Sequence, residues 1–147
     1  MKKYAIDTNL YNDAFRRTDA ADELKTFYAT FAPGTYLSSV VLHELLVGTT
    51  SAARARDVQQ QIAGPFRRTR RVLTPSAEAW ALAGESIAAM ARRDKREIRT
   101  LPKSLVNDFL LAASCRESGV ILITRNLADF ESINRFIKVQ VTEPWPE

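Results

Sequence analysis

The sequence predicts an α/β fold in which one mainly parallel β-sheet is covered by helices on both faces. Short apolar runs alternate along the chain with segments of helical periodicity, which indicates βαβ units. These runs are apolar almost throughout, as strands buried on both faces require. The length of 147 residues suits one domain with a sizeable core, so we expect a single domain over residues 1–147.

Five segments rich in apolar and β-branched residues are expected to form the strands. They cover residues 3–6, 35–39, 71–75, 120–124 and 137–141. Polar residues follow the first and fourth of them directly, in "IDTN" and in "ITRNLADF". In parallel sheets, sites lie beyond the carboxyl ends of the strands, where the strand order reverses. These polar residues are therefore the first candidates for a functional site.

Four segments have the spacing of amphipathic or buried helices. They cover residues 20–31, 40–48, 76–93 and 104–119. Ser76 and Ser104 are expected to cap the amino termini of the third and fourth helices. Gly48 and Gly119 are expected to end the second and fourth, as glycine commonly does after the last helical residue.

Composition restricts the class of protein. Hydrophobic residues make up 46% and charged residues 26%, as in ordinary soluble domains. No apolar run approaches the roughly 20 residues that span a bilayer, and "MKKYAIDTNL" is too soon interrupted by Asp7 for a signal peptide. The single cysteine excludes an internal disulfide framework and suits a reducing compartment. We expect a cytoplasmic protein without a membrane partner.

The net charge of +4 is unevenly distributed. Residues 67–71 and 92–103 each carry a net charge of +4, which leaves −4 on the rest of the chain. A basic stretch on an otherwise acidic chain favours a polyanionic partner, because neutralised phosphates release counterions. The alternative is a solvated helix end that carries arginines.

Two carboxylates stand out by position. Asp7 directly follows the first expected strand, although an aspartate there commonly caps the next helix. Asp108 has apolar helical neighbours three, four and seven residues away, which places it on a buried helix face near the amino terminus. A carboxylate there needs a cation, a hydrogen-bond donor or a metal ion. The alternative for Asp108 is a carboxylate that accepts hydrogen bonds from the first-turn amides.

Two further carboxylates give weaker signals individually. Glu44 lies in a helix that is apolar almost all round, and Asp129 could cap a short helix at residues 130–136. Two of the four acidic residues follow strands and two project from apolar helix faces. Like charges gathered at one sheet edge would raise each other's pKa unless a cation lies among them. All-oxygen ligands select Mg²⁺ or Mn²⁺.

Other residues are less informative. His43 has no second histidine or a cysteine near it in sequence, so we expect a packing role and no zinc site. Cys115 shares the apolar face of Asp108 and is expected to be a small buried hydrophobe. The P-loop, GxGxxG and GxSxG motifs are all absent, which argues against the commonest nucleotide and acyl-transfer sites.

The order of motifs along the chain resembles that of PIN-domain ribonucleases, most closely the VapC toxins of prokaryotic toxin–antitoxin pairs. The resemblance rests on "AIDTNLY", "SSVVLHELLVG", "NDFLLAASCRESGVILITRNLADF" and "VQVTEP", and it covers essentially the whole chain. It implies a PIN-like three-layer sandwich with a central parallel five-stranded sheet in the order 3-2-1-4-5. It also implies that Asp7, Glu44, Asp108 and Asp129 are catalytic and hold Mg²⁺ or Mn²⁺, with Thr8, Asn9, Thr124 and Asn126 as supporting polar groups.

The resemblance also implies an activity and partners. The activity is that of an endoribonuclease that cleaves phosphodiester bonds of transfer or ribosomal RNA with a metal-activated water. The partners are a VapB-like antitoxin that covers the active site, a second copy in a homodimer, and operator DNA only through the antitoxin. An exposed apolar groove is expected for the antitoxin; residues 23–31 and 40–48 are candidates for it.

The basic stretch acquires a role in this reading. We expect seven basic residues to bind RNA phosphates: Arg92, Arg93, Lys95, Arg96, Arg99, Lys103 and Arg125.

Two other enzyme classes fit poorly, because a haloacid-dehalogenase motif needs Asp where Asn9 stands and a receiver domain needs an Asp after the third strand. The remaining alternative is a non-catalytic PIN-fold binding module that acts with a DNA-binding partner.

Overall fold

A computed structural model describes all 147 residues and contains one five-stranded sheet. The strands are β1 (Tyr4–Ile6), β2 (Thr35–Ser38), β3 (Val72–Leu73), β4 (Ile121–Ile123) and β5 (Val141–Thr142). Their order is β3-β2-β1-β4-β5, and every neighbouring pair is parallel. The predicted fold class and strand order are confirmed.

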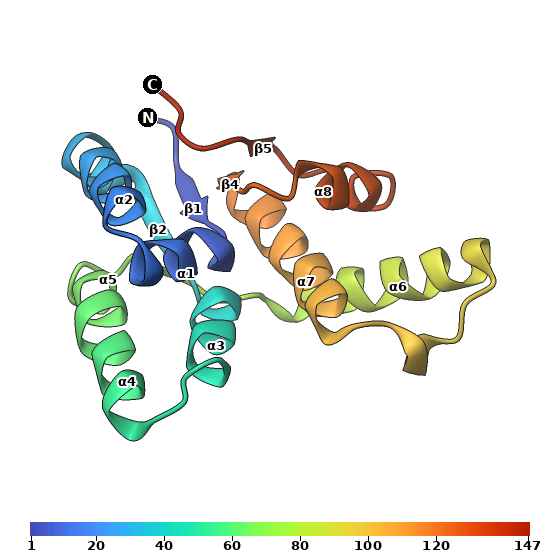
Figure 1. Ribbon diagram of the computed structural model, residues 1–147. Helices are drawn as coiled ribbons and strands as arrows, with labels where there is room; N and C mark the ends of the chain where they lie inside the picture. Colours follow the sequence, from blue (N-terminus) through green and yellow to red (C-terminus); the bar gives the residue numbers. More distant parts are fainter.

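The helices fall into two groups (Figure 1). The first contains α1 (Thr8–Arg16), α2 (Thr18–Phe31), the 3₁₀ turn η1 (Ala32–Gly34), α3 (Ser39–Val47), α4 (Ala52–Asp57), the π-helical η2 (Val58–Ala63) and α5 (Gly64–Arg68). The second contains α6 (Ala77–Asp94), the 3₁₀ turn η3 (Ile98–Thr100), α7 (Lys103–Ser118) and α8 (Leu127–Ile133). None of these helices combines the length and the apolarity needed to cross a lipid bilayer.

The strand order reverses between β1 and β4. From β1 the chain moves outward through β2 to β3, then returns past β1 to β4 and continues to β5. Because crossovers between parallel strands are right-handed, this reversal puts the two helix groups on opposite faces of the sheet. Tyr4 pairs with Ile121 and Ile6 with Ile123, so β1 and β4 end side by side. Their shared carboxyl edge is where such sheets place a site.

The four expected helices are present, with differences at their ends. Ser76 caps α6 by accepting a hydrogen bond from the Ala79 N–H at 3.1 Å. Gly119 ends α7 in the left-handed conformation, at φ 65°. The prediction that Ser104 caps α7 is wrong, because the helix already begins at Lys103, directly after Pro102, and Ser104 lies within its first turn. A proline fixes its own φ near the value found here, −61°, and so presets the chain for the first turn.

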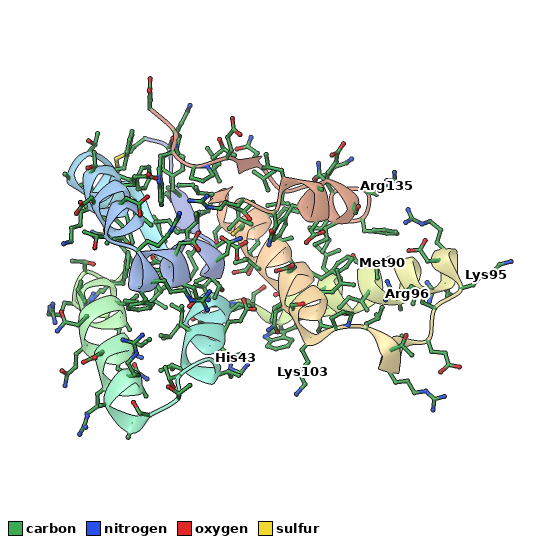
Figure 2. The ribbon with its side chains drawn as sticks, in the orientation of Figure 1. His43, Met90, Lys95, Arg96, Lys103 and Arg135 are labelled. Carbon is green, nitrogen blue, oxygen red and sulfur yellow. The ribbon has the colours of Figure 1, made fainter.

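Three other local predictions differ from the structure. The last strand covers only Val141–Thr142, because the Val139 N–H bonds to Asn134 Oδ1 at 2.8 Å instead of a neighbouring strand. The short helix expected at residues 130–136 begins earlier, at Leu127, so Asp129 lies in its first turn and does not cap it. His43 is exposed on α3, so the expected packing role is wrong (Figure 2).

The core is one cluster of 32 buried residues centred on the sheet. Ala5, Ile6, Leu122 and Ile123 have no exposed surface, as the apolar runs of β1 and β4 predict. Cys115 is buried beside them, and burial raises the pKa of its thiol to about 12. A thiol with so high a pKa is a small hydrophobe and not a nucleophile at neutral pH, as expected.

Candidate active site

Asp7 lies at the carboxyl end of β1, and only 4% of its surface is exposed. Its Oδ1 accepts a hydrogen bond from the Thr8 N–H at 2.8 Å, so Asp7 does cap α1. Its Oδ2 accepts a second one from Thr124 Oγ1 at 2.7 Å. Burial raises the pKa of Asp7, the two hydrogen bonds lower it, and the charge of Asp129 raises it further. The capping role and a place among other carboxylates therefore coexist.

Thr124 connects the ends of β1 and β4. It is completely buried, and its Oγ1 accepts a hydrogen bond from the Asn126 N–H at 3.0 Å while donating to Asp7. The turn between β4 and α8 is thus held against Asp7 through one hydroxyl. Asn126 takes part through its backbone alone, since its exposed side chain makes no hydrogen bond.

Glu44 reaches the same edge from α3, a helix of the first group. Its Oε1 accepts a hydrogen bond from Thr8 Oγ1 at 2.9 Å. Burial raises the pKa of Glu44 and so does the charge of Asp7, whereas Thr8, Asn107 and His43 lower it. Thr8 therefore ties Asp7 through its backbone and Glu44 through its side chain. Asn107 was not singled out from the sequence; its place beside Asp108 was the available signal.

Asp108 shows the strongest electrostatic effect in the cluster. Burial, followed by the charges of Asp7, Glu44 and Asp129, raises its pKa to about 8. Without a cation Asp108 is therefore mostly neutral at pH 7. The four predicted acidic residues share one electrostatic environment, although three come from different helices and one from a strand end. Asp129 is the exposed member of the set.

The residues present fit a hydrated hard cation. All four acidic residues and Asn9 offer oxygen donors, and the Asn9 Oδ1 atom is buried without a hydrogen-bond partner. No three acidic, histidine or cysteine side chains lie close enough together to form a closed metal cage. Mg²⁺ retains several waters and binds proteins through one or two carboxylates, so it does not need such a cage.

The predicted RNA-binding residues are all exposed, but they differ in their surroundings. Arg93 and Arg96 line a cavity of about 380 Å³ together with Asp108 and Asp129. The other five do not line it. Arg99 pairs with Glu97 at 2.7 Å, and Arg125 pairs with Asp13 of α1 at 3.2 Å.

A separate apolar groove of about 450 Å³ lies between α1, α2 and α5. Tyr11 and Tyr28 meet within it, with their hydroxyl oxygens 2.7 Å apart. The expected segment 23–31 contributes Leu24, Lys25 and Tyr28, whereas the segment 40–48 contributes no residue to the groove.

Comparison with known families identifies the class of protein. The PIN domain family profile matches residues 4–135, and the chain belongs to the PIN domain family. This agrees with the sheet order and with the resemblance of its motifs. No curated protein shows significant sequence similarity to the chain.

Solved structures with the same fold come from VapBC and Fit complexes. DNA-bound VapBC from Salmonella typhimurium contains a chain with a TM-score of 0.69 and 21% identity, over 97% of this chain and 98% of that one. FitAcB from Neisseria gonorrhoeae contains a chain with a TM-score of 0.66 and 19% identity, over 98% of this chain and 99% of that one. VapBC2 from Rickettsia felis, bound to a DNA fragment from its promoter, contains a chain with a TM-score of 0.62 and 19% identity, over 97% of this chain and 98% of that one. At this identity the likeness shows a common fold over nearly the whole of each chain.

Proposed function

We propose that this PIN-domain protein is a VapC-like toxin, an endoribonuclease that depends on Mg²⁺ or Mn²⁺ and cleaves transfer or ribosomal RNA. The observation that carries the proposal is the electrostatic coupling of four carboxylates at the strand-order reversal, where burial, followed by the charges of the other three, raises the pKa of Asp108 to about 8. Such strongly perturbed groups concentrate at functional sites.

The four acidic side chains would hold the ion, some of them through its bound waters. Asp7 is fixed for this role by Thr8 and Thr124, and Glu44 by Thr8. Asn9 offers a buried oxygen without a partner, and we assign a supporting role to Thr8, Asn9, Thr124 and Asn126. A divalent ion at this place would supply a more acidic water and offset the charge that develops on the phosphoryl oxygens. Asp108 would have to release its proton when the ion binds.

The basic residues would hold the RNA. We assign phosphate contacts to the stretch 92–103 and to Arg125, with Arg93 and Arg96 nearest to the carboxylates because they share a cavity with Asp108 and Asp129. The pairing of Arg125 with Asp13 supports a smaller contribution from that residue.

The groove between α1, α2 and α5 supports the antitoxin part of the proposal. It is predominantly apolar and bears Lys25 and Arg71 among its lining residues, so it would suit an apolar segment with some acidic residues. VapBC structures with the same fold were solved with bound DNA. We propose that a VapB-like antitoxin occupies the groove, that operator DNA is bound only through it, and that the toxin is a homodimer.

The test is cleavage of total cellular RNA by the purified, antitoxin-free protein with Mg²⁺ or Mn²⁺. We expect discrete fragments that disappear with EDTA and with Asp7→Asn. The variant keeps the oxygen that accepts the Thr8 N–H, so it should stay folded, which circular dichroism would verify. Metal-dependent cleavage by folded Asp7→Asn would contradict the assignment of Asp7.

A second candidate is a non-catalytic PIN-fold module that acts with a DNA-binding partner. It is favoured by the lack of a closed group of three metal-ligating side chains. Mn²⁺ titration of the wild type decides between the two, because a non-catalytic module is expected to bind no ion at this edge and to cleave no RNA.

A further inference from the structure

The cavity shared by the basic stretch and the carboxylates has two chemically different ends. It lies between the last turn of α6, the loop before α7, the first turns of α7, and α8. Arg93, Asp94 and Arg96 lie in its wall on the α6 side, where the net charge is positive, and Asp108 and Asp129 lie in its wall on the side of the carboxylate cluster. Its volume of about 380 Å³ falls in the range of small-ligand pockets.

The backbone at the end of α6 directs Arg96 toward this cavity. Lys95 adopts the left-handed conformation at φ 53°, and the Arg96 N–H returns to the Ala91 carbonyl at 2.9 Å. This pattern of a left-handed residue followed by a returning N–H is the Schellman ending of a helix. Figure 2 shows the result: Lys95 points outward at the tip of the structure, whereas Arg96 lies on the inner side, near Met90.

Arg96 is the cation most available to a ligand in the cavity. The Arg93 Nε donates to Asp94 at 2.9 Å, and the guanidinium of Arg93 lies 5.1 Å from the centre of the Phe136 ring. The Arg96 side chain makes no ion pair or hydrogen bond, although its charge helps to lower the pKa of Asp94 in the same wall. An unpaired guanidinium can bind a phosphate with two parallel N–H donors.

The cavity also has an apolar part, which a simple phosphate site would not need. Met90, Pro102 and Leu105 line it. Met90 is 7% exposed and Leu105 packs against the core, so both surfaces are firmly held. An apolar surface beside a guanidinium suits a nucleotide whose base has left the stack, because the base can then lie against side chains.

We propose that this cavity binds one unpaired nucleotide of the RNA next to the cleaved bond, with Arg96 on a phosphate and Met90 and Leu105 against the base. The inference rests on the proposed nuclease function and deepens it. It requires the RNA to be single-stranded at the site. It also assigns Arg96 a defined contact that the other exposed cations of the stretch 92–103 do not make.

The experiment measures binding of a fluorescent single-stranded oligoribonucleotide by anisotropy, with EDTA present so that cleavage plays no part. Arg96→Ala removes a charge from the cavity, and Arg92→Ala removes the same charge from the same stretch outside it. We expect Arg96→Ala to weaken binding about tenfold, as loss of a hydrogen bond to a charged group does. We expect Arg92→Ala to weaken it no more than about threefold, because a phosphate contact of this exposed side chain is screened by solvent and salt.

A second pair of variants adds a charge. Ser104→Glu puts a carboxylate into the cavity. Ala77→Glu puts one on the exposed first residue of α6, whereas the cavity lies at the last turn of that helix. Both changes lie in the first turn of a helix, where an acidic residue is stabilising, so neither should unfold the protein. We expect Ser104→Glu to weaken binding about tenfold and to abolish the preference for the single strand over a hairpin. Ala77→Glu should retain that preference.

Equal losses within each pair of variants would overturn the inference and leave only a diffuse basic surface. Displacement of the RNA by a polyglutamate peptide but not by mononucleotides would also overturn it, in favour of an acidic protein segment. The cleavage test stands apart from these outcomes. If the wild type fails to cleave RNA yet shows the expected pattern of binding, the nuclease proposal fails and the cavity assignment holds.

Discussion

The acidic edge, formed by Asp7, Glu44, Asp108 and Asp129, and the basic stretch 92–103 are both charged, but the chain builds them differently. Residues far apart in sequence hold the acidic edge together: 117 positions separate Asp7 from Thr124, and 36 separate Thr8 from Glu44. The basic stretch is held by near neighbours, since Arg93 bonds to Asp94 and Arg99 to Glu97. One region is a product of the tertiary fold and the other of local sequence.

This difference indicates which property matters in each region. Side chains fixed by buried partners can be placed accurately, as the binding of an ion and a reacting phosphate requires. Exposed cations act mainly through their summed field, which salt screens. Arg96 is the exception, because the turn at Lys95 gives it a defined place. Substitutions should therefore have large effects at the acidic edge and graded effects in the basic stretch.

The largest effect should come from removing the partner of Asp7. Thr124→Val keeps the shape of the side chain and the N–H that bonds to the Thr142 carbonyl, but it removes the hydroxyl that donates to Asp7. We expect Mn²⁺ affinity to fall by roughly 10–100-fold, as for other residues that orient metal ligands. Calorimetric titration would measure it. Thr124→Ser is the control and should bind Mn²⁺ like the wild type; equal affinity in Thr124→Val would show that the hydroxyl has no such role.

The same contrast explains what the sequence could predict. Asp7 and Thr124 lie at the ends of apolar runs, and the carboxyl ends of parallel strands meet at one edge of a sheet. The hydrogen bond between the two side chains agrees with this prediction. The apolar helical neighbours of Asp108 indicated burial, and its raised pKa agrees. Such features can be predicted from the sequence because burial on a parallel sheet requires apolar residues along a whole strand or helix face.

Features that depend on single backbone choices were not predictable. The distinction between Arg96 and Arg92 depends on one left-handed lysine, and lysine carries no preference for that conformation. The short β5 depends on the Asn134 side chain, which takes the Val139 N–H from the sheet. The helices α4 and α5 were also not foreseen, because "AARARD" and "GPFRR" are short and lack a clear apolar stripe. The helix α1 was missed although it has such a stripe, with Leu10 and Tyr11 buried on one face.

A second test compares how the two regions respond to pH. In the metal-free protein the pKa of Asp108 is raised to about 8, so the folded state holds a proton that the unfolded state has lost. Stability should therefore fall as pH rises from about 5 to 8, because the native state binds more protons in that window. Since Asp108 is partly exposed, we expect the free energy of unfolding to fall by about 1–2 kcal/mol in total, well below the value that the whole pKa shift would give.

Asp94 in the basic stretch should behave in the opposite sense. Its hydrogen bond and charge interaction with Arg93 lower its pKa, so its contribution is present at neutral pH and is lost only in acid. Thermal unfolding in EDTA at several pH values would measure both effects. Asp108→Asn should flatten the slope between pH 5 and 8, and Asp94→Asn should leave it unchanged. An unchanged slope in Asp108→Asn would assign the titration to another group.

The smallest expected effect tests the turn that places Arg96. Lys95 occupies a left-handed position that costs a non-glycine residue about 1 kcal/mol, so Lys95→Gly should stabilise the protein by up to that amount. Arg92→Gly, three residues earlier and still within α6, should destabilise it by a similar amount. Thermal unfolding would show opposite shifts of about 2–4 °C for a chain of this size. If both glycines destabilise the protein, Lys95 does not adopt the left-handed turn in solution, and the placement of Arg96 loses its support.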